Sequence, residues 1–155
     1  MEGLNNKIVC EFYKALAARD AKMVQYLLAP DIDWWFHGPP AHKYNLMQVL
    51  TGICEFDCND SYEPLVVVSI GTIVVAEGYH IHENRKTFWV HVWTVGNGKT
   101  ITEVREYLDT SVTVTHIRKP SDVCLASPRS PAECKNMWES KLANNAFVPR
   151  LLLVV

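Results

Sequence analysis

The sequence predicts an α+β fold in which helices cover one face of a curved antiparallel sheet. Three segments within residues 5–54 carry apolar side chains at helical spacing, whereas residues 64–117 are rich in β-branched and aromatic side chains and are divided by turns. Helices followed by a run of long strands are typical of this class. Because 155 residues suffice for one sizeable core, we expect a single domain over residues 1–155.

Three helices are expected in the N-terminal part of the chain. In residues 5–18 the apolar side chains share one helical face, namely Ile8, Val9, Phe12 and Leu16. Asp20 can cap a second short helix over residues 21–29, which Pro30 ends. A third helix is expected over residues 45–54, although Gly52 weakens its end.

One short strand precedes the third helix, and four longer strands follow it. Residues 32–37 form the short strand, and the glycine and prolines at 38–40 turn the chain. The longer strands are expected at residues 64–70, 72–82, 86–95 and 100–117. Residues 119–155 are expected to form a Ser/Pro-rich loop, a short helix over residues 134–142 and a tail that packs back onto the body.

Composition and charge argue against several classes of protein. A formal net charge of -2 with scattered basic residues indicates no nucleic-acid surface. No segment reaches the roughly 20 apolar residues of a membrane span, and the N-terminus does not resemble a signal peptide. The cysteines are irregularly spaced, and no Cys/His pair completes a zinc site with Cys54 and Cys58. We therefore expect a cytoplasmic protein, able to reach the nucleus by diffusion, with no metal or other cofactor.

The turn at Asn97-Gly98 predicts which side chains of a hairpin share a face. If the residues flanking this two-residue turn pair, Trp89 lies opposite Glu106. Alternation then places six side chains on one side: Trp89, His91, Trp93, Val104, Glu106 and Leu108. This face is aromatic with one carboxylate and one imidazole, whereas the other face mixes aliphatic and charged residues and suits a dimer interface. A carboxyl group among tryptophans is desolvated, and such groups can exchange protons near neutral pH.

Five segments carry a family resemblance: WWFHGPP, WVHVWTV, ITEVREYLDTSVTVT, MWES and FVPRLLLVV. In this order they resemble the plant wound-induced protein family, also described as senescence- or stress-associated, within the nuclear-transport-factor-2-like (SnoaL-like) superfamily. The resemblance implies a cone-shaped α+β fold, in which a strongly bent antiparallel sheet is wrapped by three N-terminal helices around an internal cavity. It also implies a homodimer. A fold of this kind does not by itself fix a function.

Two motifs are similar to those of limonene epoxide hydrolase, a member of the same superfamily. WFHGP resembles the hydrolase pattern Tyr-x-Asn-x-Pro, which implies that Trp35 and His37 take the positions of a water-binding Tyr and an Asn. VREYLD resembles WRDYFD, which implies that Glu106 takes the position of a catalytic Asp. The Arg-x-Asp pair of the hydrolase is not matched, since AEGYHIH stands there. This departure argues against epoxide hydrolysis.

Seven residues are thus predicted to form a site. The catalytic candidates are Glu106 and His37, and the ligand-binding candidates are Trp35, Tyr79, Trp89, His91 and Trp93. Simpler alternatives stay open. The aromatic residues could be ordinary core, Glu106 could form an ion pair with Arg85 or Arg105, and the imidazole of His91 could be satisfied by a structural hydrogen bond.

The sequence does not orient the histidine-rich strand that precedes the hairpin. Tyr79, His80 and His82 alternate along it, and their facing toward the cavity is left open. A metal site built from His80, His82 and His91 is conceivable, but alternating histidines in strands are weak support for one. We therefore expect no metal.

Residues and resemblance together predict a pocket for a small hydrophobic metabolite of terpenoid or polyketide type. Glu106 or His37 would take a proton from the substrate or water while the other stabilises the developing charge, which would assist isomerisation, cyclisation or hydration. The alternative is a non-catalytic accessory protein that carries intermediates to a biosynthetic oxidase. A third hypothesis is an interaction module with a filled cavity. The sequence leaves open whether the protein is an enzyme.

Overall fold

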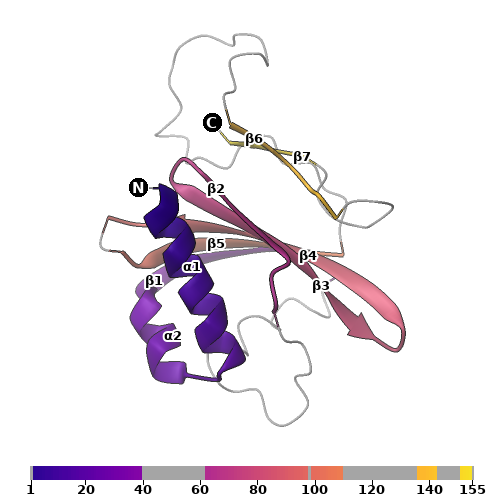
Figure 1. Cartoon of the computed structure of the whole chain (residues 1–155), viewed down its shortest axis with the longest axis horizontal. Coiled ribbons are helices and arrows are strands. Elements are labelled where there is room, and N and C mark those ends of the chain that lie inside the picture. Colours follow the sequence, from indigo (N-terminus) through magenta and orange to yellow (C-terminus); the bar gives the residue numbers. More distant parts are fainter. Residues whose placement is uncertain (1, 40–61, 98, 110–135, 143–150, 155) are drawn as a thin grey trace.

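The computed structural model describes residues 2–39, 62–97, 99–109, 136–142 and 151–154 (Figure 1). Two helices and seven strands lie in these ranges. The third helix expected over residues 45–54 and the loop expected over residues 119–131 lie outside them. Within the same ranges, no helix is both long and apolar enough to cross a membrane.

The first two predicted helices are confirmed. Their bounds are Glu2–Ala17 for α1 and Ala21–Leu27 for α2. The predicted apolar face of α1 is buried, with Val9 and Phe12 completely inaccessible to solvent. α2 begins after Asp20, whose carboxylate accepts a hydrogen bond from the backbone N–H of Met23 at 3.1 Å. This bond satisfies one of the free N–H groups at the start of the helix.

Five strands form one sheet against the helices (Figure 1). Their bounds are Leu28–His37 for β1, Val66–Ile70 for β2, Ile73–His82 for β3, Arg85–Val95 for β4 and Ile101–Leu108 for β5. The order in the sheet is β1-β5-β4-β3-β2. β2 to β5 pair antiparallel as predicted, whereas β1 runs parallel to β5. The sheet is therefore mixed, because β1 joins it beside a strand far along the chain, as parallel pairing requires.

The predicted hairpin of β4 and β5 is confirmed, with a shifted register. Trp89 pairs with Leu108, and His91 pairs with Glu106, two residues further along than a simple two-residue turn would give. The backbone N–H of Gly96 donates to the carbonyl of Thr100, so the turn is longer than two residues. The strand pairing also shifts by a bulge or similar irregularity between Thr94 and Val95, the last two residues of β4. A shift of two keeps each side chain on its predicted face, because side chains alternate with a period of two.

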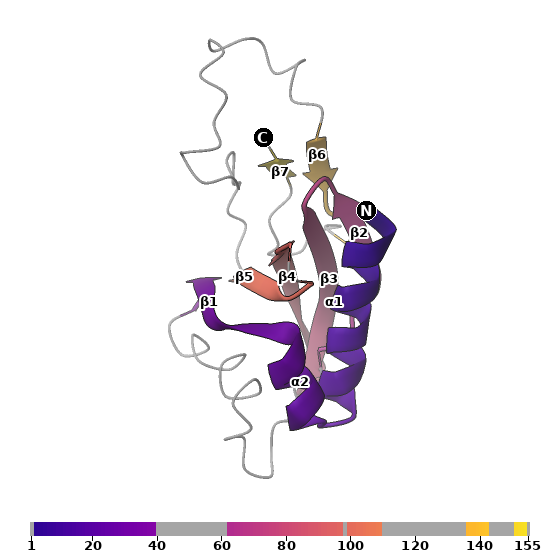
Figure 2. The same cartoon turned by 90° about the vertical axis from the view of Figure 1, so that its left-hand side faces the viewer.

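The sheet separates two layers of apolar side chains. Both α1 and α2 cover one face of the sheet, which we call the inner face (Figure 2). This face holds the larger core. On the opposite, outer face lies a smaller cluster, which we call the outer-face cluster: Ile73, Val75, Val90, Val92, Tyr107 and Trp138. Trp138 belongs to β6 (Asn136–Glu139), which pairs antiparallel with β7 (Leu151–Val154). The helix expected over residues 134–142 is thus wrong for residues 136–139, because pairing with β7 overrides the local helical pattern.

A buried carboxylate ties β6 to the outer face. Glu77 on β3 is 1% exposed. One of its oxygens accepts a hydrogen bond from the Ser140 hydroxyl at 2.5 Å, and the other accepts one from the backbone N–H of Lys141 at 2.9 Å. With both oxygens bonded, this carboxylate compensates much of the free energy that its burial costs.

Replacing Trp138 by alanine should detach residues 136–142 from the sheet. Truncation of a buried tryptophan costs about 3–5 kcal/mol of unfolding free energy, which urea denaturation would measure. Hydrogen exchange should also quicken at the Lys141 N–H that bonds Glu77. Tyr26→Ala, at an exposed position on α2, is the control and should stay within about 0.5 kcal/mol of the wild type. Unchanged exchange at Lys141 would contradict the anchoring role of Trp138.

Candidate functional site

The inner face carries aromatic side chains around one imidazole and one carboxylate, as the hairpin alternation predicts. Trp89, His91 and Trp93 on β4 and Glu106 on β5 are each 0% exposed. The ladder places His91 directly opposite Glu106. The predicted facing of these four residues is therefore confirmed.

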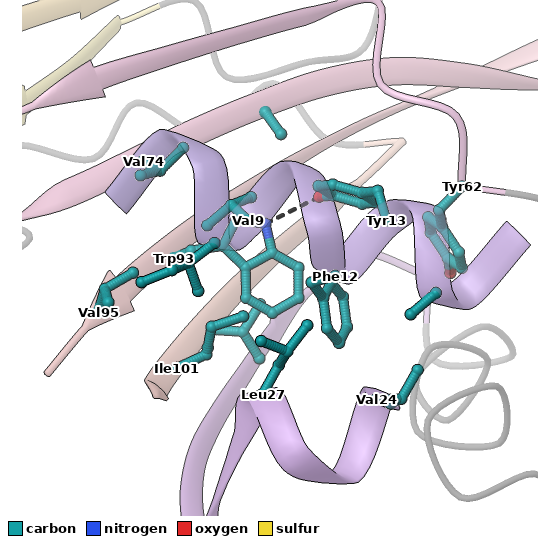
Figure 3. Close-up of a cluster of buried hydrophobic side chains, with 14 of the residues drawn as sticks. Val9, Phe12, Tyr13, Val24, Leu27, Tyr62, Val74, Trp93, Val95 and Ile101 are labelled. Atoms are coloured by element: carbon teal, nitrogen blue, oxygen red, sulfur yellow. Dashed lines mark hydrogen bonds between the residues drawn. The ribbon is translucent and has the colours of Figure 1, made fainter. Parts of the chain in front are cut away.

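A continuous chain of hydrogen bonds runs through this buried layer. Trp93 Nε1–H donates to the Tyr13 hydroxyl at 2.8 Å (Figure 3). The same hydroxyl lies 2.7 Å from Nδ1 of His91. The other ring nitrogen of His91, Nε2, lies 2.7 Å from Oε2 of Glu106. Because all four side chains are buried, these bonds act in a medium of low dielectric constant, where they are stronger than in water.

The prediction missed Tyr13, the member of the chain that comes from α1. Its position four residues after Val9 places it on the buried face of the helix, so helical spacing could have identified it. Burial raises the pKa of Tyr13 well above its ordinary value, and the nearby Glu106 adds to the rise while the hydrogen bond from Trp93 opposes it. Tyr13 therefore keeps its proton throughout the physiological range.

Aromatic rings surround His91 on several sides. The ring centroid of Trp89 lies 4.4 Å away, that of Tyr62 5.0 Å and that of Tyr13 6.0 Å. Gly78 on β3 makes room for Trp89, since a Cβ at that glycine would lie 2.7 Å from the indole ring. These contacts fix the imidazole plane and hold the His–Glu pair away from water.

The prediction that Trp35 and His37 face the inner layer is wrong. In the parallel pairing of β1 with β5, Phe36 lies opposite Glu106, so alternation turns Phe36 inward and its two neighbours outward. Trp35 is 50% exposed, with its ring 5.5 Å from the guanidinium of Arg105. The two neighbours do share a face, as predicted, but it is the outer one. His37 therefore cannot act together with Glu106.

His37 instead stacks on the outer face. Its ring lies 5.1 Å from that of Tyr107, nearly parallel at 9°. Burial lowers the pKa of His37 below its ordinary value, and the positive charge of Arg105 lowers it further. The neutral imidazole is thus the favoured form.

The strand β3 can now be oriented. Tyr79 packs on Phe88, which borders the outer-face cluster, and lies under the ammonium of Lys86 at 4.7 Å. Tyr79, a ligand-binding candidate whose facing the sequence leaves open, therefore lies on the outer face, away from the layer that holds His91 and Glu106. His80 faces inward, with its ring 4.7 Å from that of Tyr62. The side chain of His82 lies outside the described part of the chain.

The open alternatives for Glu106 can also be resolved. Arg105 pairs with Glu103 at 2.7 Å and Arg85 with Asp109 at 3.3 Å, so neither arginine is the partner of Glu106. Its partner is His91 through Oε2, whereas its Oε1 has no hydrogen-bond partner among the described residues. The described residues also contain no group of three or more potential metal ligands, and Cys54 and Cys58 lie outside them.

Tyr13→Phe should destabilise the protein without changing its shape. The change leaves the Trp93 N–H and His91 Nδ1 without their buried partner, and each unsatisfied group costs about 1–3 kcal/mol. Urea denaturation would measure the loss. Tyr26→Phe removes the same hydroxyl from an exposed tyrosine and should have no measurable effect. Equal stabilities of the two variants would contradict the buried chain.

The pKa of His37 should rise toward its ordinary value near 6.5 when Arg105 is replaced by glutamine, because one of the two causes of its lowering is removed. NMR titration of the imidazole resonances would measure this. Arg85→Gln, which removes a charge paired with Asp109, is the control and should leave the titration unchanged. Since the folded pKa is the lower one, the contribution of His37 to stability is present above its ordinary pKa and is lost as pH falls through the folded value. An identical titration in Arg105→Gln would refute the assignment.

Comparison with known proteins reveals close relatives in plants. Residues 47–155 match the family described as wound-induced protein WI12. The chain is 40% identical over 117 residues to senescence associated gene 20 of Arabidopsis thaliana. It is 42% identical over 113 residues to wound-induced protein 1 of Solanum tuberosum. Each of these matches covers 70% of this chain and 100% of the relative.

Solved structures support the fold. An NTF2-like protein from Burkholderia xenovorans LB400 is similar with a TM-score of 0.53 at 26% identity, over 70% of this chain and 92% of that chain. An LEH-like epoxide hydrolase of M. tuberculosis is similar with a TM-score of 0.50 at 18% identity, over 70% of this chain and 84% of that chain. At that identity the second likeness concerns the fold alone. The chain has a nuclear-transport-factor-2-like fold and belongs to the wound-induced protein WI12 family.

Proposed function

We propose that the inner face binds a small hydrophobic metabolite of terpenoid or polyketide type, and that Glu106 meets its polar group. One observation carries the proposal: His91 and Glu106 form a completely buried pair at 2.7 Å among aromatic rings. Burying such a pair costs desolvation free energy that an apolar core would avoid. Ligand sites in proteins are mostly apolar, with a few polar groups that orient the ligand.

The pair is suited to general acid–base chemistry. In a reaction at this site, Glu106 takes a proton from the substrate or a bound water and returns it, while His91 holds the carboxyl group in place. The similarity of VREYLD to the hydrolase motif supports a reacting role for Glu106. The residue that assists it is His91 rather than the predicted His37. Isomerisation, cyclisation and hydration each need a proton transfer of this kind.

A second function, as an accessory protein, is supported by the outer face. Trp35 is half exposed beside Arg105, and tryptophan and arginine are enriched at the energetic centres of protein interfaces. We propose that this edge contacts another protein, either a second copy of the chain or a biosynthetic enzyme that receives the metabolite. Trp138 already packs on the outer-face cluster, so we propose that a homodimer through this face uses the β1 edge.

Two neighbours on β1 provide a matched test of ligand binding. Phe36 faces the inner layer and Trp35 the outer one, so Phe36→Ala should weaken the retention of a ligand and Trp35→Ala should not. Native mass spectrometry of the wild type and both variants, each exposed to an extract of wounded plant tissue, would measure retained mass. Loss in Trp35→Ala but not in Phe36→Ala, or no ligand in any of the three, would refute the inner-face site. With a captured ligand in hand, turnover that disappears in Glu106→Gln while binding persists would distinguish catalysis from carriage.

A further inference from the structure

We propose that Tyr13 and Trp93 are positioning residues that hold His91 neutral with its proton on Nε2, so that the polar group of the ligand meets Oε1 of Glu106 and is a neutral hydroxyl. The ligand class in this proposal rests on the proposed function. The directions of the hydrogen bonds are independent of it, because they are derived from the protein's own side chains.

The direction of the first bonds follows from what each group can donate. The indole N–H of Trp93 is a donor without an acceptor, so the Tyr13 oxygen must accept it. Tyr13 keeps its own proton, as its strongly raised pKa requires. That hydrogen cannot point at a donor, and the acceptor that the described residues offer it is Nδ1 of His91, at 2.7 Å. Tyr13 therefore donates to Nδ1.

The state of the imidazole follows in turn. Because Nδ1 accepts, the ring proton lies on Nε2 and is donated to Oε2 of Glu106 at 2.7 Å. A positively charged imidazole would carry hydrogen on both nitrogens. The Tyr13 oxygen would then receive two N–H groups, and its own hydrogen would have no acceptor among the described residues. The chain is thus satisfied in one direction, from Trp93 through Tyr13 and His91 to Glu106.

The series of hydrogen bonds ends at the carboxyl group of Glu106, where one oxygen is left without a partner among the described residues. That oxygen, Oε1, is buried. Glu77 shows the contrast, because it is equally buried on the other face of the same sheet and has both oxygens bonded, by Ser140 and Lys141. Glu77 is satisfied by the protein itself. Glu106 retains a hydrogen-bonding position that a ligand can fill.

The chemistry of that position selects the ligand class. A hydroxyl both donates and accepts, so it can pair with Oε1 whether or not this oxygen carries a proton. A hydrocarbon would leave Oε1 unsatisfied. A carboxylate would bring a second acid group against Glu106, while Arg85 and Arg105 are committed to Asp109 and Glu103. The site therefore fits an apolar alcohol or enol.

Histidine NMR tests the positioning role without any ligand. Long-range proton–nitrogen spectra at neutral pH distinguish the two neutral tautomers and the charged imidazole, and we expect the Nε2–H tautomer for His91. Tyr13→Phe should yield a mixture of tautomers, because the donor to Nδ1 is lost. Trp93→Phe should yield a smaller fraction of the second tautomer, because the Tyr13 hydroxyl is then free to rotate. This variant replaces Tyr13→Phe as the test if Tyr13→Phe does not fold. Tyr26→Phe is the control and should match the wild type.

An Nδ1–H or charged His91 in the wild type would overturn the proposal. An unchanged Nε2–H tautomer in both Tyr13→Phe and Trp93→Phe would also overturn the positioning role, since a merely structural contribution would alter stability but leave the tautomer as it is. The wild-type spectrum alone decides the direction of the chain, whatever the stability of the variants.

Three probes with one ring skeleton test the ligand class: menthol, p-menthane and p-menthane-3-carboxylic acid. A change in tryptophan emission would report binding. We expect menthol to bind about tenfold more tightly than the other two probes, which is the effect of one buried hydrogen bond to an ionisable group. Glu106→Leu should remove this preference, whereas Glu103→Gln, on the outer face, should keep it. Equal or tighter binding of the hydrocarbon or the carboxylate would overturn the ligand class. If no probe binds, both the proposed ligand site on the inner face and the ligand class are contradicted. The NMR experiment would still test the positioning role of Tyr13 and Trp93, because it uses no ligand.

Discussion

The hydroxyl of Tyr13 joins helix α1 to the sheet through two polar bonds. It lies between Trp93 and His91, two residues of β4 that are 80 and 78 positions away along the chain. Either bond fails if α1 slides or rotates on the sheet, because hydrogen bonds weaken steeply with distance and angle. Apolar packing between α1 and β4 would tolerate several docking positions, whereas the hydroxyl tolerates one. The geometry of the His91–Glu106 pair therefore depends on how α1 sits.

The two faces of the sheet carry different side chains because β1 pairs with β5 in one register and not in the register shifted by one residue. With Phe36 opposite Glu106, the inner layer gains a phenyl ring beside its carboxylate and the outer face gains Trp35 and His37. A slip of one residue would exchange these sets and place an exposed tryptophan in the core. The exchange would also separate Trp35 from Arg105, which now share the outer face. The register of one edge strand thus determines both the candidate pocket and the candidate docking edge.

Local patterns were sufficient to predict α1, α2 and the hairpin of β4 and β5. Helical spacing gave the buried face of α1, and alternation gave the facing of His91 and Glu106 even though the turn shifted the register by two. The facing of Trp35 could not be derived in this way, because it depends on a parallel partner that follows it by about 70 residues. The motif similarity to a hydrolase identified Glu106 correctly as a residue of the inner layer and His37 incorrectly. Similar letters at similar spacing do not fix which face of a strand they occupy.

Oε1 of Glu106 has no hydrogen-bond partner within the part of the chain that the structure describes, and this affects the energetics of binding. In a solvated pocket, a carboxyl group must lose water before it bonds a ligand, and this loss cancels much of the new bond. Glu106 is 0% exposed in the folded protein and bonded to His91, so its removal from bulk solvent already takes place when the protein folds. A ligand hydroxyl that reaches Oε1 then contributes a bond with little opposing cost, as expected of a preorganised site. The free energy that this oxygen costs in folding is in this way available to binding, and a protein that only needed a stable core would gain by replacing Glu106 and His91 together with apolar residues of similar volume.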